Sequence, residues 1–162
     1  MLEINFGPFP RLQTARLVLR QPQPEDADAL YALRSDPGVM RYFGRPLMKD
    51  REEARQFLEL VNANFVNNEG LQWTICLSGD PRLIGTITIW KIDKVNHRAE
   101  IGYLLDPEYQ GQGIMTEALK ALIRHAFETL RLHSLEANVN PENEASINLL
   151  ERNGFVREAY FR

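Results

Sequence analysis

Residues 109–117 read YQGQGIMTE, with two glycines one residue apart directly before a long helical pattern. From Met115 to Leu130 apolar residues recur at steps of three and four, which predicts an amphipathic helix. Gly111 and Gly113 would therefore precede a helix N-terminus, where backbone N–H groups lack partners and the helix dipole is positive. Because glycine has no Cβ, a phosphate could approach these amides closely. The segment is a candidate anion site, and a tight strand-to-helix turn is the alternative.

Composition limits the kinds of protein that the sequence can encode. Its 162 residues, 44% of them hydrophobic, suit one domain with a normal buried core. A net charge of −3 argues against nucleic acid as a partner, since phosphate binding needs a basic face. The single cysteine, Cys76, lies in an alternating run and is expected in the core, so no disulfide framework is predicted. Without a leader pattern or a run of ~18 apolar residues, we expect a soluble, cytoplasmic protein that does not bind membranes.

The other segments alternate between strand and helix patterns without repeats. Apolar alternation predicts strands over 14–20, 73–77, 83–90, roughly 98–105 and 134–139. Helical spacing and end signals predict helices over 25–34, from 50 to about 65, over 115–130 and, ended by Gly154, over about 144–153. Around the glycines the order is strand, loop, helix, strand, helix, strand. We therefore expect a mixed α/β chain of the α+β class.

Four blocks of the chain carry a resemblance to a known family. They read TARLVLR, LIGTITI, AEIGYLLDPEYQGQGIMTEAL and NVNPENEASINLLERNGF. In this order they resemble the GNAT superfamily of acetyl-coenzyme A dependent N-acetyltransferases, and most of all the branch with the RimJ/RimL ribosomal-protein N-terminal acetyltransferases. The resemblance implies a single GNAT domain over 1–162. It also implies a central, mostly antiparallel sheet that is flanked by helices and splays between the strands at 98–105 and 134–139.

The resemblance also implies where acetyl-CoA, the expected cosubstrate, would bind. The family's phosphate signature matches from Gln110 to Ile114, and Met115 departs from its last position, where Gly or Ala is usual. The diphosphate would rest on the amides of Gln110, Gly111, Gln112, Gly113, Ile114 and Met115. The pantetheine arm would pair with the backbone of Tyr103, Leu104 and Leu105. Asn138 and Asn143 would hydrogen-bond the arm from the other side, although Asn143 also suits a helix cap.

The expected reaction needs a free amine, a stabilised oxyanion and a proton for the departing thiolate. Glu100, just before the coenzyme contacts, is the candidate base through a water, and an exposed strand carboxylate is the alternative. Ser146 completes the branch pattern Asn143-Glu144-Ala145-Ser146 and is the candidate donor to the thiolate; a serine in a first helical turn is the alternative. Many relatives place a tyrosine where this chain has Leu150. A backbone N–H near Leu104 is the expected oxyanion donor.

Three functions stay open at this point. The resemblance implies a protein N-terminal α-amine as the favoured acceptor, and such an amine needs less help from a base, because its reference pKa of about 7.7–8 lies far below the ~10.4 of lysine. A small-molecule amine acceptor such as an amino acid, polyamine or antibiotic, or a coenzyme-binding module without catalysis, are the alternatives. The acceptor helices near the N-terminus do not decide between them.

The histidines do not predict a metal site, and the end of the sequence differs from the family pattern. His97, His125 and His133 have no ligand spacing with one another or with Cys76, so we expect surface or loop histidines and no metal site. Relatives of the branch continue past Gly-Phe-Val-Arg-Glu with a turn and a last strand. Either this sequence is cut short or another segment fills that place. An unpaired sheet edge there would favour association, for example a homodimer.

Overall fold

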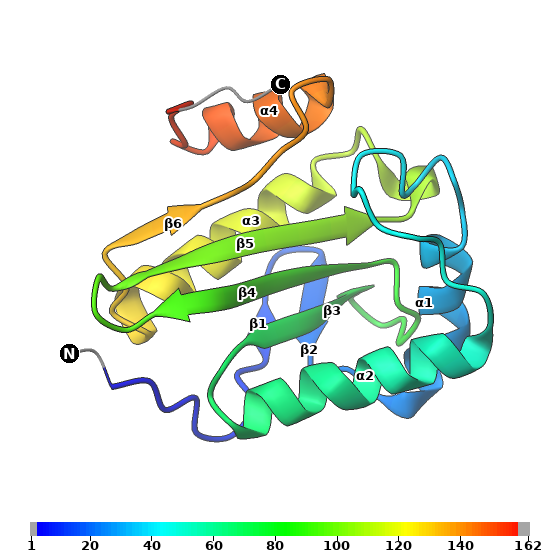
Figure 1. Cartoon of the computed structure of the whole chain (residues 1–162), viewed down its shortest axis with the longest axis horizontal. Helices are drawn as coiled ribbons and strands as arrows, with labels where there is room; N and C mark the ends of the chain where they lie inside the picture. The colour runs from blue at the N-terminus through cyan, green and yellow to red at the C-terminus, as the bar shows by residue number, and fades with distance from the viewer. Residues whose placement is uncertain (1–2, 159–162) are drawn as a thin grey trace.

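One sheet with strand order β1-β2-β3-β4-β5-β6 organises the computed structural model, which describes residues 3–158 (Figure 1). The strands are β1 Leu12–Gln13, β2 Leu17–Arg20, β3 Leu71–Leu77, β4 Gly85–Asp93, β5 Arg98–Leu105 and β6 Ser134–Glu136. The helices are α1 Ala27–Arg34, α2 Arg51–Val66, α3 Ile114–Arg124 and α4 Glu144–Arg152, with short 3₁₀ turns at Pro24–Asp26 and Pro107–Tyr109. The expected α+β class is confirmed.

The sheet is antiparallel except at its last pair of strands. Each of β1 to β4 pairs antiparallel with the next strand, whereas β5 and β6 run parallel. Their register begins at Arg98 opposite Ser134 and ends at Glu100 opposite Glu136. Within residues 3–158, the rest of β5 has no strand on this side, so the predicted splay is confirmed. The strand predicted over 134–139 is shorter than expected, because it leaves the sheet after Glu136.

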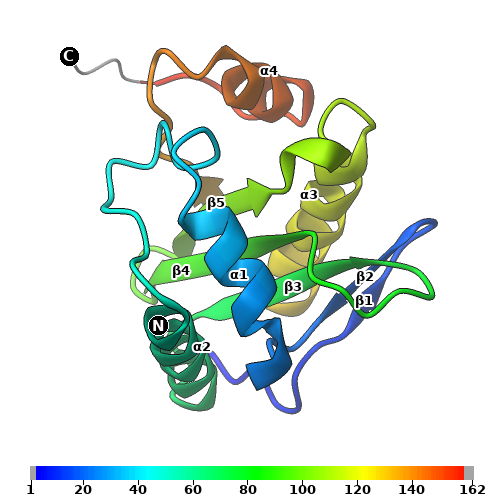
Figure 2. The same ribbon diagram turned by 90° about the vertical axis from the view of Figure 1, so that its right-hand side faces the viewer.

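Helices cover the two faces of the sheet, α3 on one and α1 with α2 on the other (Figure 2). Strand β5 contributes to both sides, because successive side chains of a strand point to opposite faces. Ile101 and Leu105 pack in the larger core with α3. Leu104 packs in the smaller core with α1 and α2. Glu100 and Gly102 lie four and two residues before Leu104 and thus share its face.

Local signals explain the helix ends. The carboxylate of Asp50 accepts a hydrogen bond from Glu53 N–H at 2.9 Å and so caps α2, at the position where the helix is predicted to begin. Gly154 has φ +91° directly after α4, as expected for a helix-ending glycine. The strand predicted to begin at Thr14 begins at Leu17 instead, because Thr14 N–H bonds to the Leu17 carbonyl and closes a turn.

The expectation for the histidines was wrong at one of the three positions. After Arg124 the helix continues as a π-helical turn, His125–Thr129. This turn places His125 in the core, edge-on to Trp73 at 5.7 Å between ring centroids, and burial lowers its pKa. His97 and His133 directly precede β5 and β6, and their rings stack with 4.2 Å between the ring centroids. Cys76 is buried, as predicted.

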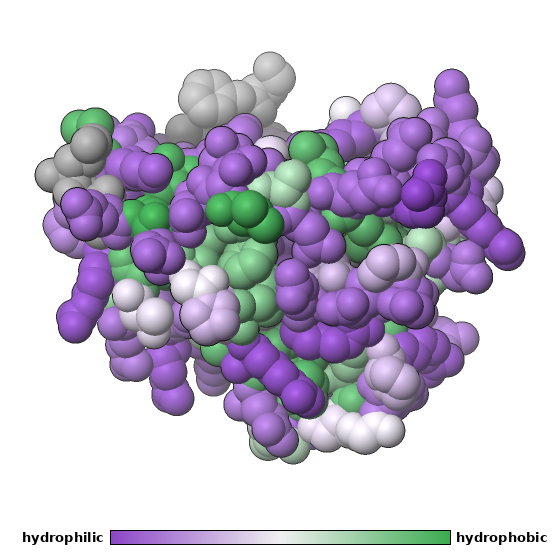
Figure 3. All heavy atoms as spheres, turned by 90° about the horizontal axis from the view of Figure 1, so that it is seen from below, coloured by the Kyte–Doolittle hydropathy of each residue, from purple (hydrophilic) through white to green (hydrophobic). Residues whose placement is uncertain are grey.

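The outer surface is polar where Figure 3 shows it. This view looks from below onto the side where α2 lies in Figure 1, and hydrophobic residues form small separate areas on a mostly hydrophilic face. Helix α2 exposes Leu60 and Val66. Within the described residues, no helix has the length and hydropathy of a membrane span. The expectation for the chain beyond Glu158 lies outside the described residues.

Candidate functional site

The glycine loop has the backbone form that its composition predicts. Gly111 and Gly113 have φ +74° and +76°, in the left-handed region that favours glycine, and Gly113 is the N-cap of α3. The turn interpretation is thus confirmed, and it leaves the first amides of α3 facing outward as an anion site requires. Ile114 and Met115 turn their side chains into the core. Met115 therefore does not crowd the outside of the loop, although its size departs from the family signature.

A cluster around Glu117 ties the loop to the start of β2. The carboxylate of Glu117 accepts hydrogen bonds from Thr14 Oγ1 at 2.5 Å, from Arg16 N at 3.0 Å and from Arg16 Nε at 3.1 Å. Arg16 also donates from Nη1 to the Gln112 carbonyl at 2.9 Å. Burial raises the pKa of Glu117, but the hydrogen bonds from Thr14 and Arg16 outweigh it, and the pKa lies below its usual value of 4.5.

Sequence reasoning missed the role of Arg16, since its partners lie about a hundred residues further along the chain. Its second terminal nitrogen, Nη2, lies 3.4 Å from the place where a Cβ on Gly113 would stand. The guanidinium thus borders the outer side of the loop. A cation at this place adds to the positive potential of the helix N-terminus.

Backbone alternation decides which peptide groups of β5 face the gap. The Leu104 carbonyl lies against Gly85 of β4, and Asp106 N–H donates to the Ile84 carbonyl at 2.8 Å. Since the peptide groups of a strand point to alternate sides, those of Leu104 face β4 and those of Tyr103 and Leu105 face the gap. The Leu105 carbonyl accepts from the Gln110 side chain at 3.3 Å, which agrees with this direction. This geometry corrects the expectation that Leu104 pairs with a bound arm.

Glu100 is buried and held from two sides, so its reading as an exposed strand carboxylate was wrong. One oxygen accepts a hydrogen bond from the Asn138 side chain. The other lies 3.2 Å from Lys91 Nζ as an ion pair, without the angle of a good hydrogen bond. Next to it, Gly102 leaves open space, since a Cβ there would meet no atom within 4 Å. The carboxylate therefore borders an unfilled place on the α1/α2 face.

On the opposite face of β5, the side chain of Tyr103 contacts Ser146 of α4. The Tyr103 phenol and the Ser146 hydroxyl are hydrogen-bonded between β5 and α4. Burial raises the pKa of Tyr103, and the hydrogen bond to Ser146 lowers it by less. Asn143 caps α4 by accepting from Ser146 N–H at 3.2 Å, which is the alternative given for it. Leu150 is buried and carries no acid. The tyrosine partner of Ser146 was not foreseen as a proton donor.

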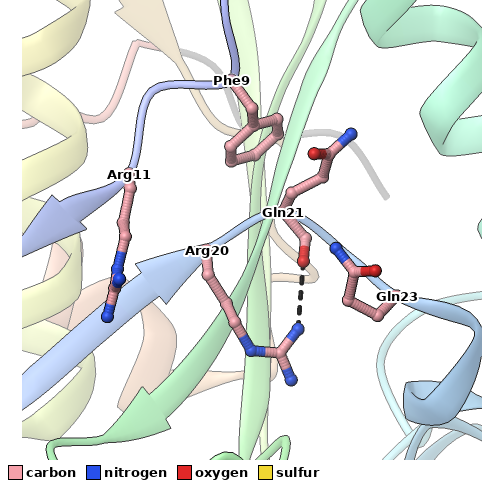
Figure 4. Close-up of a pocket in the computed structure, with 5 residues that line it drawn as sticks. All are labelled: Phe9, Arg11, Arg20, Gln21 and Gln23. Atoms are coloured by element: carbon pink, nitrogen blue, oxygen red, sulfur yellow. Dashed lines mark hydrogen bonds between the residues drawn. The ribbon is translucent and has the colours of Figure 1, made fainter.

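Two surface hollows lie away from these residues. The one in Figure 4 is lined by Phe9, Arg11, Arg20, Gln21 and Gln23, with Arg20 donating to the Gln21 carbonyl at 3.0 Å. The second shares Arg20 and continues along Asp26 and Leu83. Neither contains a predicted site residue. In the described part of the chain no three histidine, cysteine or carboxylate side chains gather as metal ligands.

Comparison with known proteins identifies the family. The family model described as an acetyltransferase (GNAT) domain matches residues 16–156. The uncharacterized N-acetyltransferase p20 of Bacillus licheniformis is 37% identical over 151 residues, which cover 93% of this chain and 85% of the relative. The chain belongs to the GNAT acetyltransferase family. The expected enzyme class, an acetyltransferase, is confirmed.

Two further GNAT relatives are informative about acceptors. The [ribosomal protein uS5]-alanine N-acetyltransferase of Escherichia coli is 29% identical, in a match that covers 94% of this chain and 81% of the relative. The solved structure of spermidine N-acetyltransferase from Vibrio cholerae, in complex with CoA and spermine, is 25% identical with a TM-score of 0.79 and covers 90% of this chain and 84% of that one. Both N-terminal and small-molecule acceptors thus occur among relatives of this fold.

Glu117 gives a pH-dependent prediction for the glycine loop. Because its pKa is lowered in the fold, its stabilisation is present above the usual value of 4.5 and is lost as pH falls through the folded pKa. Glu117→Gln should lower the melting temperature at pH 7 by about 3–8 °C, from the loss of charged hydrogen bonds. The difference from wild type should shrink below pH ~4. Thermal unfolding from pH 3 to 8 measures it, with the exposed Glu128→Gln as control. A difference that is constant over this range would mean that Glu117 acts by packing alone.

Proposed function

We propose that this chain transfers the acetyl group of acetyl-CoA to a protein N-terminal α-amine, by direct attack in a ternary complex. The observation that carries the proposal is the gap that opens between β5 and β6 after Glu100 and ends at the glycine loop before α3. The gap exposes backbone groups that an extended amide-bearing arm can pair with, and the loop offers amides to a diphosphate. The name of the uS5-alanine relative supports the N-terminal acceptor.

The proposed cosubstrate contacts follow from which groups are still free. The carbonyl of Tyr103 and the N–H of Leu105 would pair with the arm, since the Leu105 carbonyl already accepts from the Gln110 side chain, and the diphosphate would rest on the amides of 110–115. Asn138 donates to Glu100 and keeps its amide oxygen for an N–H of the arm. Asn143 uses its oxygen as the α4 cap and keeps its NH₂ group for a carbonyl. An oxyanion would be met by the N–H of Tyr103, in place of the Leu104 N–H.

Glu100 is suited to take the proton from the amine. The amine nitrogen bonds to the acetyl carbonyl carbon, the carbon–sulfur bond breaks, and the proton of the amine passes to Glu100 through a water. The open place over Gly102, beside Glu100, gives the amine room to approach from the α1/α2 face. The Lys91 and Asn138 contacts hold the carboxylate in one orientation. An α-amine needs less help than a lysine, because its reference pKa of about 7.7–8 leaves roughly 10–20% of it unprotonated at pH 7, against well under ~0.1% for lysine.

Tyr103 and Ser146 are suited to return a proton to the thiolate. A phenol, with a reference pKa near ~10, is a much stronger acid than a serine hydroxyl. In our proposal Ser146 donates to the thiolate and takes a proton from Tyr103 at the same time. Burial raises the pKa of Tyr103, so the phenol is protonated at neutral pH and gives up its proton only while Ser146 passes one to the thiolate. The phenolate regains a proton from water after the products leave.

A small-molecule amine is the second candidate acceptor, supported by the fold's likeness to spermidine N-acetyltransferase. An acceptor panel separates the two. Thiol release from acetyl-CoA is measured with a peptide that has a free N-terminus, with the same peptide blocked at the N-terminus but carrying a lysine, and with spermidine. We expect the free peptide to be consumed at least tenfold faster than either other acceptor. Faster turnover of spermidine, or no turnover with any amine, would contradict the proposal.

The proton relay predicts a non-additive pair of substitutions. Tyr103→Phe and Ser146→Ala should each lower kcat about tenfold or more, with little change in the KM for acetyl-CoA, because the donor acts in the transition state. The double variant should be no worse than the poorer single one, since both break the same relay. Steady-state kinetics under chemistry-limited conditions measures this. Losses that multiply in the double variant would show that the two hydroxyls act separately, and unchanged rates would exclude both as donors.

A further inference from the structure

Two cationic side chains, Arg45 and Lys91, lie against one tryptophan on the α1/α2 face. Trp90 of β4 is half-buried and lies directly opposite Glu100 of β5 in the sheet register. The guanidinium carbon of Arg45 lies 5.4 Å from the centre of its ring, and Lys91 Nζ lies 4.5 Å from it. Arg45 comes from the segment 35–50 between α1 and α2, drawn in cyan, which lies beside the C-terminal end of β5 in both views (Figures 1 and 2).

Arg34 is a second arginine close enough to Arg45 for their charges to interact, and among residues 3–158 it has no carboxylate partner. Arg34, the last residue of α1, stacks its guanidinium 4.3 Å above the Phe57 ring, and its Nε is buried without a hydrogen-bond partner. Burial and the charge of Arg45 lower its pKa to about 10. Within residues 3–158, neither Arg34 nor Arg45 forms an ion pair. Bringing two like charges together at a partly buried place is unfavourable unless an anion joins them.

The acidic residues nearest in sequence to Arg34 and Arg45 already accept other hydrogen bonds. Asp36 accepts from Gly38 N–H at 2.8 Å within its own turn. Asp50 caps α2. Elsewhere in the molecule an arginine of comparable burial is paired, as Arg20 is with Asp26 at 2.7 Å. The pair Arg34 and Arg45 therefore has the features of an anion site that a ligand would complete.

We propose that Arg34 and Arg45 bind a carboxylate of the acceptor, and that the preferred acceptor is a peptide N-terminus with Asp or Glu at its second or third residue. This inference rests on the proposed function. Trp90 faces Glu100 across neighbouring strands, so the guanidinium of Arg45 lies roughly 10 Å from the base. An extended peptide advances about 3.3 Å per residue, which brings a side chain of its second or third residue to this distance. The α-carboxylate of a free amino acid lies too close to its amine to reach it.

The same cations oppose polyamine acceptors. A polyamine carries further positive charges a few bonds from the reacting amine, and these would lie against Arg45, Arg34 and Lys91. Like-charge contact in a partly desolvated cleft disfavours binding. An acidic residue near the amine gains a charge-assisted contact with Arg45 in the same place. The cluster would thus favour acceptors with an acidic residue near the amine and disfavour polyamines.

Three peptides that differ only at their second residue test the subsite: Ser-Glu, Ser-Gln and Ser-Lys, each followed by the same sequence. We expect kcat/KM for Ser-Glu to exceed that for Ser-Lys about tenfold or more, with Ser-Gln between them, as one charged hydrogen bond allows. Arg45→Gln should remove most of this preference, and Arg45→Glu should reverse it. Arg45 is exposed, so these variants should fold. Arg41→Gln, on the same segment but stacked over Tyr42 at 5.0 Å, is the matched control and should keep the preference.

Each outcome bears on a different claim. Equal turnover of the three peptides, or an equal loss of preference in Arg45→Gln and Arg41→Gln, overturns the subsite and leaves N-terminal acetylation standing. Free glutamate that is consumed faster than Ser-Glu would place the carboxylate on the amino acid itself and overturn the peptide assignment. Turnover of spermidine without turnover of any peptide would overturn the proposed function together with the subsite.

Discussion

The divergence of β6 from β5 after Glu100 is the constraint on which the rest of the site depends. A sheet normally pairs every inward peptide group, and an unpaired edge inside a molecule leaves donors and acceptors that need a partner. Here the pairs end at Glu100 and Glu136, so the groups of Tyr103 and Leu105 face a gap between two strands. The gap leads to the loop at which α3 begins, so one extended ligand could use both.

Because side chains alternate along a strand, consecutive residues of β5 point to different parts of the proposed site. The edge of the strand faces the gap, Glu100 and Gly102 face the α1/α2 side, and Tyr103 faces α3 and α4. A base and a proton donor can thus serve the same reacting group from opposite sides of one strand. The acceptor would approach over Gly102, where Trp90, Arg34 and Arg45 stand. In our proposal, the α1/α2 face thus sets specificity for the acceptor, while the gap binds the cosubstrate.

Local signals predicted what local structure determines. The left-handed glycines at 111 and 113, the Asp50 cap and Gly154 could be read from neighbouring residues, and family resemblance supplied the splay. Long-range contacts could not be read in the same way. Arg16 meets Glu117 across 101 positions, and Ser146 meets Tyr103 across 43, so no spacing in the sequence marks either pair. The burial of His125 depends on a π-helical turn. The direction of the Tyr103 peptide groups, toward the gap, depends on how β4 and β5 are paired. Neither could be read from the sequence.

Amide-resolved hydrogen exchange can show whether the gap and the glycine loop together form one binding site for acetyl-CoA. With saturating acetyl-CoA, we expect slower exchange at the amides of Tyr103 and Leu105 and at 111–115. Arg98 to Glu100, already paired with β6, should change little. Unchanged exchange in the gap and the loop, with protection instead around the hollow lined by Arg20 and Gln23, would contradict the account.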